Sequence, residues 1–265
     1  MNISIHVTAI LVLALAPLSG YAQSDIDDRF SISLGAFFTD WGTDVRLDSD
    51  TLGTGTDIDF ENDLGLRSST SIFRIDGHYR FNDRHRINFS VFDMSRDANQ
   101  TIDRDIQFGD IIFAINADLN ANTDLSIYKL AYTYSFLRRE SGYLGATFGF
   151  YMADSTFRLS ERNLGGAEIS DISAPLPVIG LRGSYQLSDR FTFRGSGEFF
   201  ALEYDNVDGV LTDFYVGVDY QMSQHTAIGL GYNKVSIDVD AKRDRFVGTL
   251  DWSYDGALLF LKLNF

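Results

Sequence analysis

The sequence ends on Ala257-Leu258-Leu259-Phe260-Leu261-Lys262-Leu263-Asn264-Phe265. Counted back from the last residue, every second residue is apolar, and such a period of two is typical of a β-strand with two different faces. In water, a terminal strand with a uniformly apolar face invites aggregation. A closed barrel in a membrane has no free edge and gives the apolar face a lipid solvent. The stretch therefore predicts a membrane β-barrel.

The beginning of the sequence has the pattern of an export signal. Residues 3–18 are almost wholly apolar, and the small residues Gly20 and Ala22 form an acceptable cleavage site before Gln23. The apolar run is too short for a permanent membrane helix. Because no Lys or Arg precedes the run, a buried N-terminal helix is the alternative interpretation. We expect a signal peptide over residues 1–22 and one barrel domain over residues 23–265.

The composition excludes several classes of protein. A net charge of −15 would repel the phosphates of nucleic acids, so we expect no nucleic-acid partner. The 22 Phe and 13 Tyr against 3 Pro are typical of a strand-rich chain. The sequence has no Cys, so no disulfide stabilises the fold, although the periplasm would permit one.

Apolar alternation recurs in segments that are separated by turn signals. Short turns are expected near Asp83, Glu140, Asp189 and Gln224, and the connections between them are mostly longer and acidic. Short periplasmic turns and long outer loops are typical of bacterial outer-membrane barrels. The sequence therefore predicts an all-β fold, a closed antiparallel up-and-down transmembrane barrel of about ten strands, with eight or twelve as alternatives. The expected strands cover residues 30–38, 73–81, 87–91, 128–136, 144–152, 175–187, 191–199, 214–220, 228–232 and 246–265. A β-sandwich would also alternate, but it would not combine an apolar face on nearly every strand with an export signal and a terminal Phe.

Some positions carry local expectations. Trp41 is expected at the membrane interface. Asp93 falls on an apolar face, so either its strand leaves the membrane there or a bulge shifts the register. Residues 111–119 alternate within a polar segment, which predicts a strand extension above the membrane. Asp208-Gly209 is a candidate hairpin turn, and Asp255-Gly256 is a candidate bulge in the closing strand.

The short turns are preceded by a recurring pair: Tyr79-x-Phe81, Tyr134-x-Phe136, Tyr185-x-Leu187 and Tyr220-x-Met222. Together with Gly20-Tyr21-Ala22 and the ending Leu261-Lys262-Leu263-Asn264-Phe265, these pairs make the chain resemble small bacterial outer-membrane barrels of the broad class of the OmpA transmembrane domain and OmpW-like proteins. The resemblance implies location in the cell outer membrane, insertion by the barrel-assembly machinery with Phe265 as its recognition mark, and a lipopolysaccharide-rich outer leaflet as lipid partner. It implies no activity, because one fold hosts many functions.

Three functions compete at this stage. The first is a barrel with a largely filled lumen and a structural or surface-interaction role, the second is a narrow channel for small solutes, and the third is a lipid-modifying enzyme or protease. Lipid-modifying enzymes and proteases of this barrel class resemble one another in using a His near the outer rim, together with Ser or carboxylates. His78, His85 and His225 are all expected on the periplasmic side, and His6 lies in the predicted signal. We therefore expect no enzyme and no cofactor, and the oligomeric state stays open.

One acidic run is a candidate cation site. In an extended conformation the carboxylates of Asp57, Asp59, Glu61 and Asp63 would share one side, where oxygen ligands could hold Ca²⁺. The run is not an EF-hand, because Asn62 stands where Gly is needed. We favour the alternative interpretation, a solvated acidic loop, and predict no metal.

The inward-facing positions collect charges of both signs. An unpaired charge in a narrow lumen costs several kcal/mol, so these side chains are predicted to form a cross-strand ion network that fills a barrel of this width. Within it, Arg74, Arg80, Arg182 and Arg194 are expected to face Asp76, Glu198 and Asp219. The full predicted network is Arg74, Asp76, His78, Arg80, Lys129, Arg182, Arg194, Glu198, Asp219 and Lys262.

Overall fold

The computed structural model describes residues 28–162, 167–204, 207–243 and 246–265. The predicted signal peptide over residues 1–22 lies outside the described residues, as does residue 23, where the barrel domain was expected to begin. The described residues include no helix that is long and apolar enough to cross a membrane.

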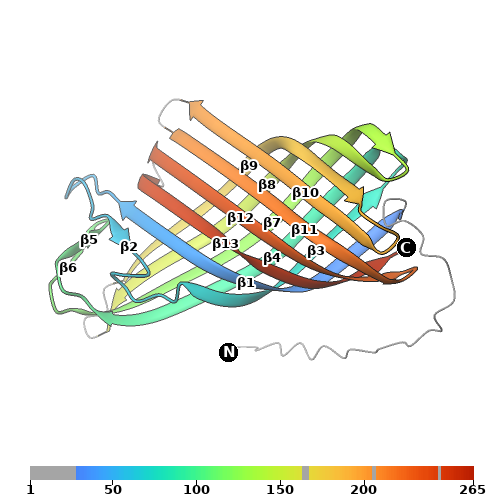
Figure 1. Ribbon diagram of the computed structural model, residues 1–265. Helices are drawn as coiled ribbons and strands as arrows, with labels where there is room; N and C mark the ends of the chain where they lie inside the picture. The colour runs from blue at the N-terminus through green and yellow to red at the C-terminus, as the bar shows by residue number, and fades with distance from the viewer. Residues whose placement is uncertain (1–27, 163–166, 205–206, 244–245) are drawn as a thin grey trace, which may run out of the picture.

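The described chain forms one closed barrel of ten long antiparallel strands (Figure 1). Each long strand pairs with its neighbour in sequence, and the last pairs with the first, which confirms the predicted fold class and strand number. The strands are β1 (Phe30–Leu47), β3 (Ser69–Arg80), β4 (His85–Thr101), β7 (Asp118–Arg139), β8 (Gly142–Glu161), β9 (Ala167–Gln186), β10 (Phe191–Tyr204), β11 (Val207–Ser223), β12 (Thr226–Arg243) and β13 (Phe246–Asn264). Three short strands lie in the connections: β2 (Ile58–Asp59), β5 (Ile106–Phe108) and β6 (Ile111–Phe113).

The seam between β1 and β13 closes the barrel without a register shift, from Ser31 opposite Asn264 to Leu47 opposite Gly248. Beyond it, the backbone N–H groups of Arg29 and Phe30 both donate to the carbonyl oxygen of Phe265 at 3.0 Å. Because β13 is paired regularly with both β1 and β12, the predicted bulge at Asp255-Gly256 is wrong. Gly256 instead permits close approach of the strands, since a Cβ there would lie 1.9 Å from the carbonyl oxygen of Phe38.

The two ends of the barrel differ. Short turns at residues 81–84, 140–141, 187–190 and 224–225 gather at one end, which we call the turn end, together with Phe265 (Figure 1). The long connections at residues 48–68 and 102–117 lie at the opposite end, which we call the loop end. Asp208 and Gly209, the candidate hairpin turn, lie within β11, and the β10–β11 connection at residues 205–206 is outside the described residues.

An apolar band surrounds the turn-end half of the outer surface. Phe38, Phe73 and Leu230 point outward and are 51%, 61% and 61% exposed. The residues of the Tyr-x-apolar pairs also lie on this surface next to the short turns. On β4 the band ends at Asp93, where the pairing with β7 continues unbroken, so the strand leaves the membrane there and no bulge occurs. The strands run on past the band, for example from Asp40 to Leu47 in β1.

Beyond the band, the apolar side changes from outside to inside, as β1 shows. In β1, Leu34 and Phe38 face outward, whereas Trp41 and Val45 are buried in the interior. The prediction that Trp41 lies at the membrane interface is therefore wrong. The strand continues without a bulge, so the odd-numbered Trp41 faces the lumen. Residues facing water on the outside must be polar there, and the apolar residues move to the inner face.

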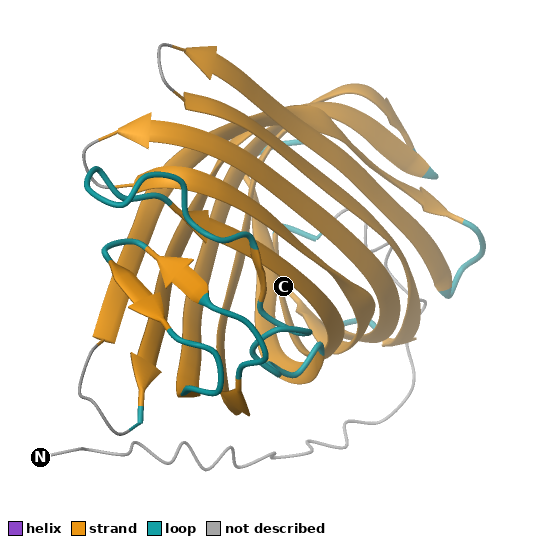
Figure 2. Ribbon diagram, turned by 90° about the vertical axis from the view of Figure 1, so that its left-hand side faces the viewer, coloured by secondary structure: helices purple, strands orange, loops and turns teal. Residues whose placement is uncertain are grey.

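The loop end is capped by its own connections. Residues 48–68, which include β2, and residues 102–117, which include the β5–β6 hairpin, fold over the barrel mouth (Figure 2). Their apolar side chains are buried in one cluster with inward residues of the strands: Ile58, Phe60, Leu64, Leu66, Ile102, Ile106, Phe108 and Phe113. The strand extension predicted for residues 111–119 is correct only from Asp118 onward, because residues 111–113 belong to the hairpin.

Candidate functional site: the polar interior of the turn-end half

Inside the apolar band, the inward positions of the strands carry charged and polar side chains. These positions alternate along each strand with the lipid-facing positions. The alternation that makes the outer surface apolar therefore makes the inner surface polar. Lys129 on β7 is 8% exposed, Glu198 on β10 4% and Asp219 on β11 1%. Such burial requires pairing, because an unpaired charge in a low-dielectric interior is costly.

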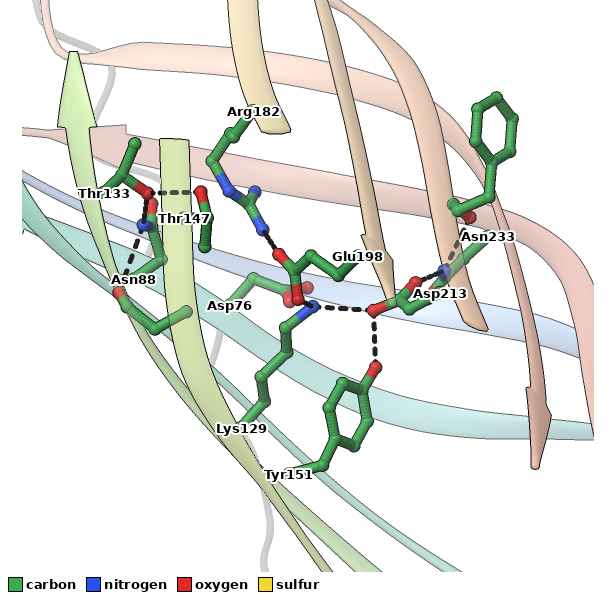
Figure 3. Close-up of polar contacts among 12 residues, drawn as sticks. Asp76, Asn88, Lys129, Thr133, Thr147, Tyr151, Arg182, Glu198, Asp213 and Asn233 are labelled. Carbon is green, nitrogen blue, oxygen red and sulfur yellow. Dashed lines mark hydrogen bonds and ion pairs between the residues drawn. The ribbon is translucent and has the colours of Figure 1, made fainter. Parts of the chain in front are cut away.

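The centre of this interior is a continuous chain of ion pairs and hydrogen bonds (Figure 3). Glu198 accepts from Arg182 at 2.9 Å and lies 2.5 Å from the Lys129 amine. Lys129 also lies 2.6 Å from Asp213, which accepts from the Tyr151 hydroxyl at 2.5 Å. The contacts therefore link β9, β10, β7, β11 and β8 across the lumen.

The chain of contacts continues on the other side of Asp213. Asn233 donates its amide N–H to Asp213 at 2.7 Å, and its amide oxygen accepts from Arg74 at 2.6 Å. Arg74 in turn holds Asp76 through Nε and Nη2, at 3.0 Å for the latter. A single amide thus joins two ion clusters and fixes their relative positions.

A second group shares one carboxylate. Asp219 Oδ2 accepts from Arg194 Nε at 2.6 Å and from the Lys262 amine at 3.2 Å. Nearer the turn end, the His78 imidazole bonds the Ser31 hydroxyl at 2.7 Å. Arg80 pairs with Asp83 in a short turn at 3.1 Å, so it lies at the mouth of the barrel and apart from the central network.

The structure thus places the ten predicted network residues on the inner face, with nine of them along the lumen and Arg80 at its mouth. Sequence reasoning omitted Asp213, Tyr151 and Asn233 from the network, although they occupy central positions in it. For Asp213 the sequence pattern was available, since Asp213 has the same parity as Asp219 and the opposite parity to the lipid-facing Phe214. Tyr151 and Asn233 carry no charge. Only their register, opposite the inward-facing Lys129 and Tyr215 respectively, places them inside the barrel.

A layer of aromatic rings covers the network on the side of the loop end. Phe37, Phe92 and Tyr254 form a triangle of edge-to-face contacts with centroids 5.7 to 6.3 Å apart. The Arg74 guanidinium lies 5.4 Å from the ring of Phe37 and 5.6 Å from that of Phe92, which favours a cation–π contact. Trp41 stacks on Trp252 immediately beyond, at 5.5 Å. These rings separate the polar interior from the apolar cap.

Between the network and the turn end lies a cavity of about 110 Å³. This volume holds several water molecules. Its walls include Arg86, which was not among the predicted site residues. Arg86 shares its parity with Asn88 and Ser90, opposite to Ile87 and Phe89, and this pattern could have identified it.

The four carboxylates of the candidate cation site have separate protein partners. Asp57 pairs with Arg46 at 3.4 Å and Asp63 with Arg104 at 2.6 Å, whereas Asp59 accepts from the backbone N–H of Asn62 at 2.8 Å. Glu61 is turned inward to a buried ion pair with Arg96. No group of three or more acidic, His or Cys side chains in the described part of the chain has a geometry that could hold a metal ion.

The Glu61–Arg96 pair fixes the cap to the barrel wall. Arg96 on β4 is 3% exposed, donates to the Thr43 hydroxyl at 2.7 Å and lies over the Trp41 ring at 5.6 Å. The other carboxylate oxygen of Glu61 accepts the backbone N–H of Thr43 at 2.9 Å. We call this arrangement the Arg96 latch.

Outside the barrel, beyond the apolar band, carboxylates line up across neighbouring strands. Asp238 on β12 is opposite Asp251 on β13, which is opposite Asp44 on β1, which is opposite Asp59 on β2. Partial burial, followed by the charges of Asp59 and Asp251, raises the pKa of Asp44 above its usual value. Partial burial and the charge of Asp251 likewise raise the pKa of Asp238.

Solved structures with a similar architecture are outer-membrane barrels. No protein-family model and no curated protein matches the sequence. The outer-membrane protease OmpT from Escherichia coli is 11% identical over 91% of this chain and 98% of that chain, with a TM-score of 0.61. Ail, the attachment invasion locus protein of Yersinia pestis, solved in complex with the heparin analogue sucrose octasulfate, is 11% identical over 89% and 97%, with a TM-score of 0.40. The Pseudomonas putida toluene transporter TodX is 10% identical over 90% of each chain, with a TM-score of 0.35.

The closed ten-stranded barrel, its apolar belt and these structural similarities define a class. The protein is an integral β-barrel of the Gram-negative cell outer membrane. Barrels in this class have varied roles, and the similar structures include a protease, an attachment protein and a transporter.

Proposed function

We propose that this protein is a sealed outer-membrane barrel whose role is structural or is a surface interaction made by its projecting loop end. The observation that carries the proposal is the filling of the lumen in successive layers. The ion network, the aromatic triangle of Phe37, Phe92 and Tyr254, and the apolar cap follow one another along the axis. A solute would have to displace all three.

The loop end supports the surface role. The short turns are assigned to the periplasm, since such barrels have short periplasmic turns. On that assignment the strand extensions and the cap stand outside the cell, where acidic side chains such as Asp44 and Asp251 face outward. We propose the lipopolysaccharide of the outer leaflet as its lipid partner and the barrel-assembly machinery as the partner that reads Phe265, whose ring is 64% exposed.

An enzymatic role has less support. OmpT is a protease by its name, but 11% identity carries over the fold and no catalytic residue. The histidines of the described chain, His78, His85 and His225, all lie toward the turn end, away from the outer surface where a protease or a lipid-modifying enzyme of this kind would work. We therefore propose no catalytic activity.

A narrow channel for small solutes is the alternative function. It would use the polar interior and would require the aromatic triangle and the cap to move. The measurement that separates the two functions is the conductance of the refolded protein in planar lipid bilayers in concentrated KCl. We expect little steady conductance from the wild type, because ions would have to pass the rings of Phe37, Phe92 and Tyr254.

The double variant Phe37→Ala/Phe92→Ala should admit ions, since it removes two rings of the triangle. Phe38→Ala is its matched control, because Phe38 neighbours Phe37 but faces the lipid. Stable, ion-selective openings from the wild type that change with Glu198→Gln or Arg194→Gln would establish the channel and contradict the sealed barrel.

A further inference from the structure

The cavity at the turn end is surrounded by more positive than negative charge. Of the described residues, six cations and four carboxylates line it or pair with its lining. The carboxylates are Asp76, Glu198, Asp213 and Asp219. The cations are Arg74, Arg86, Lys129, Arg182, Arg194 and Lys262. This excess of two positive charges occurs in a chain whose net charge is −15.

Arg86 accounts for part of the excess. Five of the six cations lie within ion-pair distance of one of the four carboxylates. Arg86 has no carboxylate within that distance among the described residues; its Nε donates to Asn88 at 2.8 Å, and its guanidinium lies 4.8 Å from the centre of the Tyr143 ring. Arg86 is 8% exposed, so bulk water compensates little of its charge.

A second cation lies directly beside Arg86. Arg80 on β3 is opposite Arg86 on β4 in the sheet register, and like charges in opposed positions destabilise a sheet. The Arg182 side chain also has a buried Nε without a hydrogen-bond partner. Arg80 already pairs with Asp83, so a bound anion would compensate Arg86 and would accept a hydrogen bond from the Arg182 Nε.

The cavity adjoins the turn end through Arg86. Arg86 lines both the cavity and a small hollow at the turn-end mouth, which is also lined by Arg80, Arg84 and Arg138. Among the described residues that line this hollow, Asp83 carries the single negative charge that opposes these arginines. Such a concentration of charge attracts anions toward the mouth. On the other side, the aromatic triangle ends the polar interior.

We propose that the turn-end half of the lumen is a blind pocket that binds a small oxyanion, with inorganic phosphate as the representative, through the Arg86 guanidinium. The planar guanidinium fork matches two oxygens of a phosphate or sulfate, which a halide lacks. The five heavy atoms of phosphate fit a cavity of about 110 Å³. This inference is independent of the surface role, because the pocket opens to the periplasmic side.

The test is calorimetric titration of sodium phosphate into the folded barrel in an uncharged detergent, near neutral pH. We expect saturable binding by the wild type and at least about tenfold weaker binding by Arg86→Gln, the scale of one hydrogen bond to a charged group. Arg190→Gln is the control, since Arg190 lies in a short turn at the same end of the barrel and contacts a tyrosine, Tyr220, but lines neither hollow. The folded, heat-sensitive band on a gel verifies each variant, and Arg86→Lys replaces Arg86→Gln if the latter does not fold.

Competition identifies the class of ligand. Sulfate should displace phosphate, whereas chloride at the same concentration and phenyl phosphate, which is too large, should not. Absence of heat from the folded wild type, or equal loss of binding in Arg86→Gln and Arg190→Gln, would overturn the pocket. Equal competition by chloride would overturn its preference for oxyanions, and equal competition by phenyl phosphate would overturn its limit on size.

Discussion

Among single residues, Glu198 is one of two carboxylates in the described interior that each pair with two cations, the other being Asp219. Its two oxygens compensate Arg182 and Lys129, and the side chain is wholly buried. Lys129 keeps Asp213 as a second partner, but Arg182 has no other ion pair in the described structure. Loss of the Glu198 charge therefore leaves a buried guanidinium uncompensated.

Glu198→Gln should lower the free energy of unfolding by about 3–5 kcal/mol, the cost of removing one partner of a buried ion pair. Urea unfolding of the protein in lipid vesicles measures this change. Glu140→Gln, the same replacement in an exposed short turn, should shift stability by less than about 0.5 kcal/mol. If both variants unfold alike, the network does not support the barrel.

The predictability of the site differs between charged and neutral residues. Most of the charged residues at inward positions were found from alternation alone, because a charge on the strand face opposite the lipid-facing side points into the lumen. Asp213 was omitted although it follows the same alternation. Tyr151 and Asn233 were not found, because a tyrosine suits either face of such a strand and the role of an amide depends on its neighbours. Arg86 was missed although its parity pointed inward.

Among the structural elements, the two long connections are held to the wall by backbone hydrogen bonds to β1, by the apolar cluster and by the buried Arg96 latch. Glu61 on the connection and Arg96 on β4 form an ion pair, and both also make a hydrogen bond with Thr43 of β1. The cap depends on this latch together with the apolar cluster around Phe60 and Phe108. Its opening would not require separation of the barrel strands.

Arg96→Gln should loosen the cap and leave the barrel folded, because it leaves Glu61 buried without a counter-charge. Limited trypsin digestion should then cleave after Arg67 and Arg104, in the two connections, faster than in the wild type. Arg158→Gln on β8, an exposed position of the same half, is the control and should leave the digestion unchanged. Unaltered cleavage in Arg96→Gln would mean that the apolar cluster alone holds the cap.

The acidic row on β12, β13, β1 and β2 gives a pH-dependent prediction. Asp44 and Asp238 have raised pKa values, so the folded state binds protons more readily than the unfolded state, and stability falls as pH rises through the range just above 3.8. Asp251→Asn removes the charge between them and should stabilise the protein at neutral pH by about 0.2–1 kcal/mol.

Urea unfolding at several pH values and salt concentrations measures this effect. The gain should vanish in acid, where the carboxylates are protonated, and shrink with added salt. Asp93→Asn, an isolated exposed carboxylate opposite Ser126, should show no such dependence. A gain that persists in acid would attribute the effect to something other than repulsion.

In the whole molecule, the sequence pattern predicted the closed barrel and its ten strands, but it did not predict how far the strands extend. Where a strand passes from lipid to water, its apolar residues move from the outer to the inner face of the barrel. In the sequence alone, this change looks the same as the change of register that a bulge produces. At Asp255-Gly256 the outward Leu259 and the inward Trp252 belong to opposite parities of one regular strand. The cap was not predictable, because its short strands lie in segments that read as polar loops.

The change of parity divides the molecule into two halves with different thermodynamics. The turn-end half keeps its apolar surface in lipid, whereas the loop-end half removes Phe60, Phe108, Trp252 and their neighbours from water. Unfolding of the loop-end half therefore exposes apolar surface to water and raises the heat capacity, as in a water-soluble domain. Its stability passes through a maximum with temperature, so that cold as well as heat weakens it. On cooling, the cap of this protein would then lose order while the membrane-spanning wall stays folded.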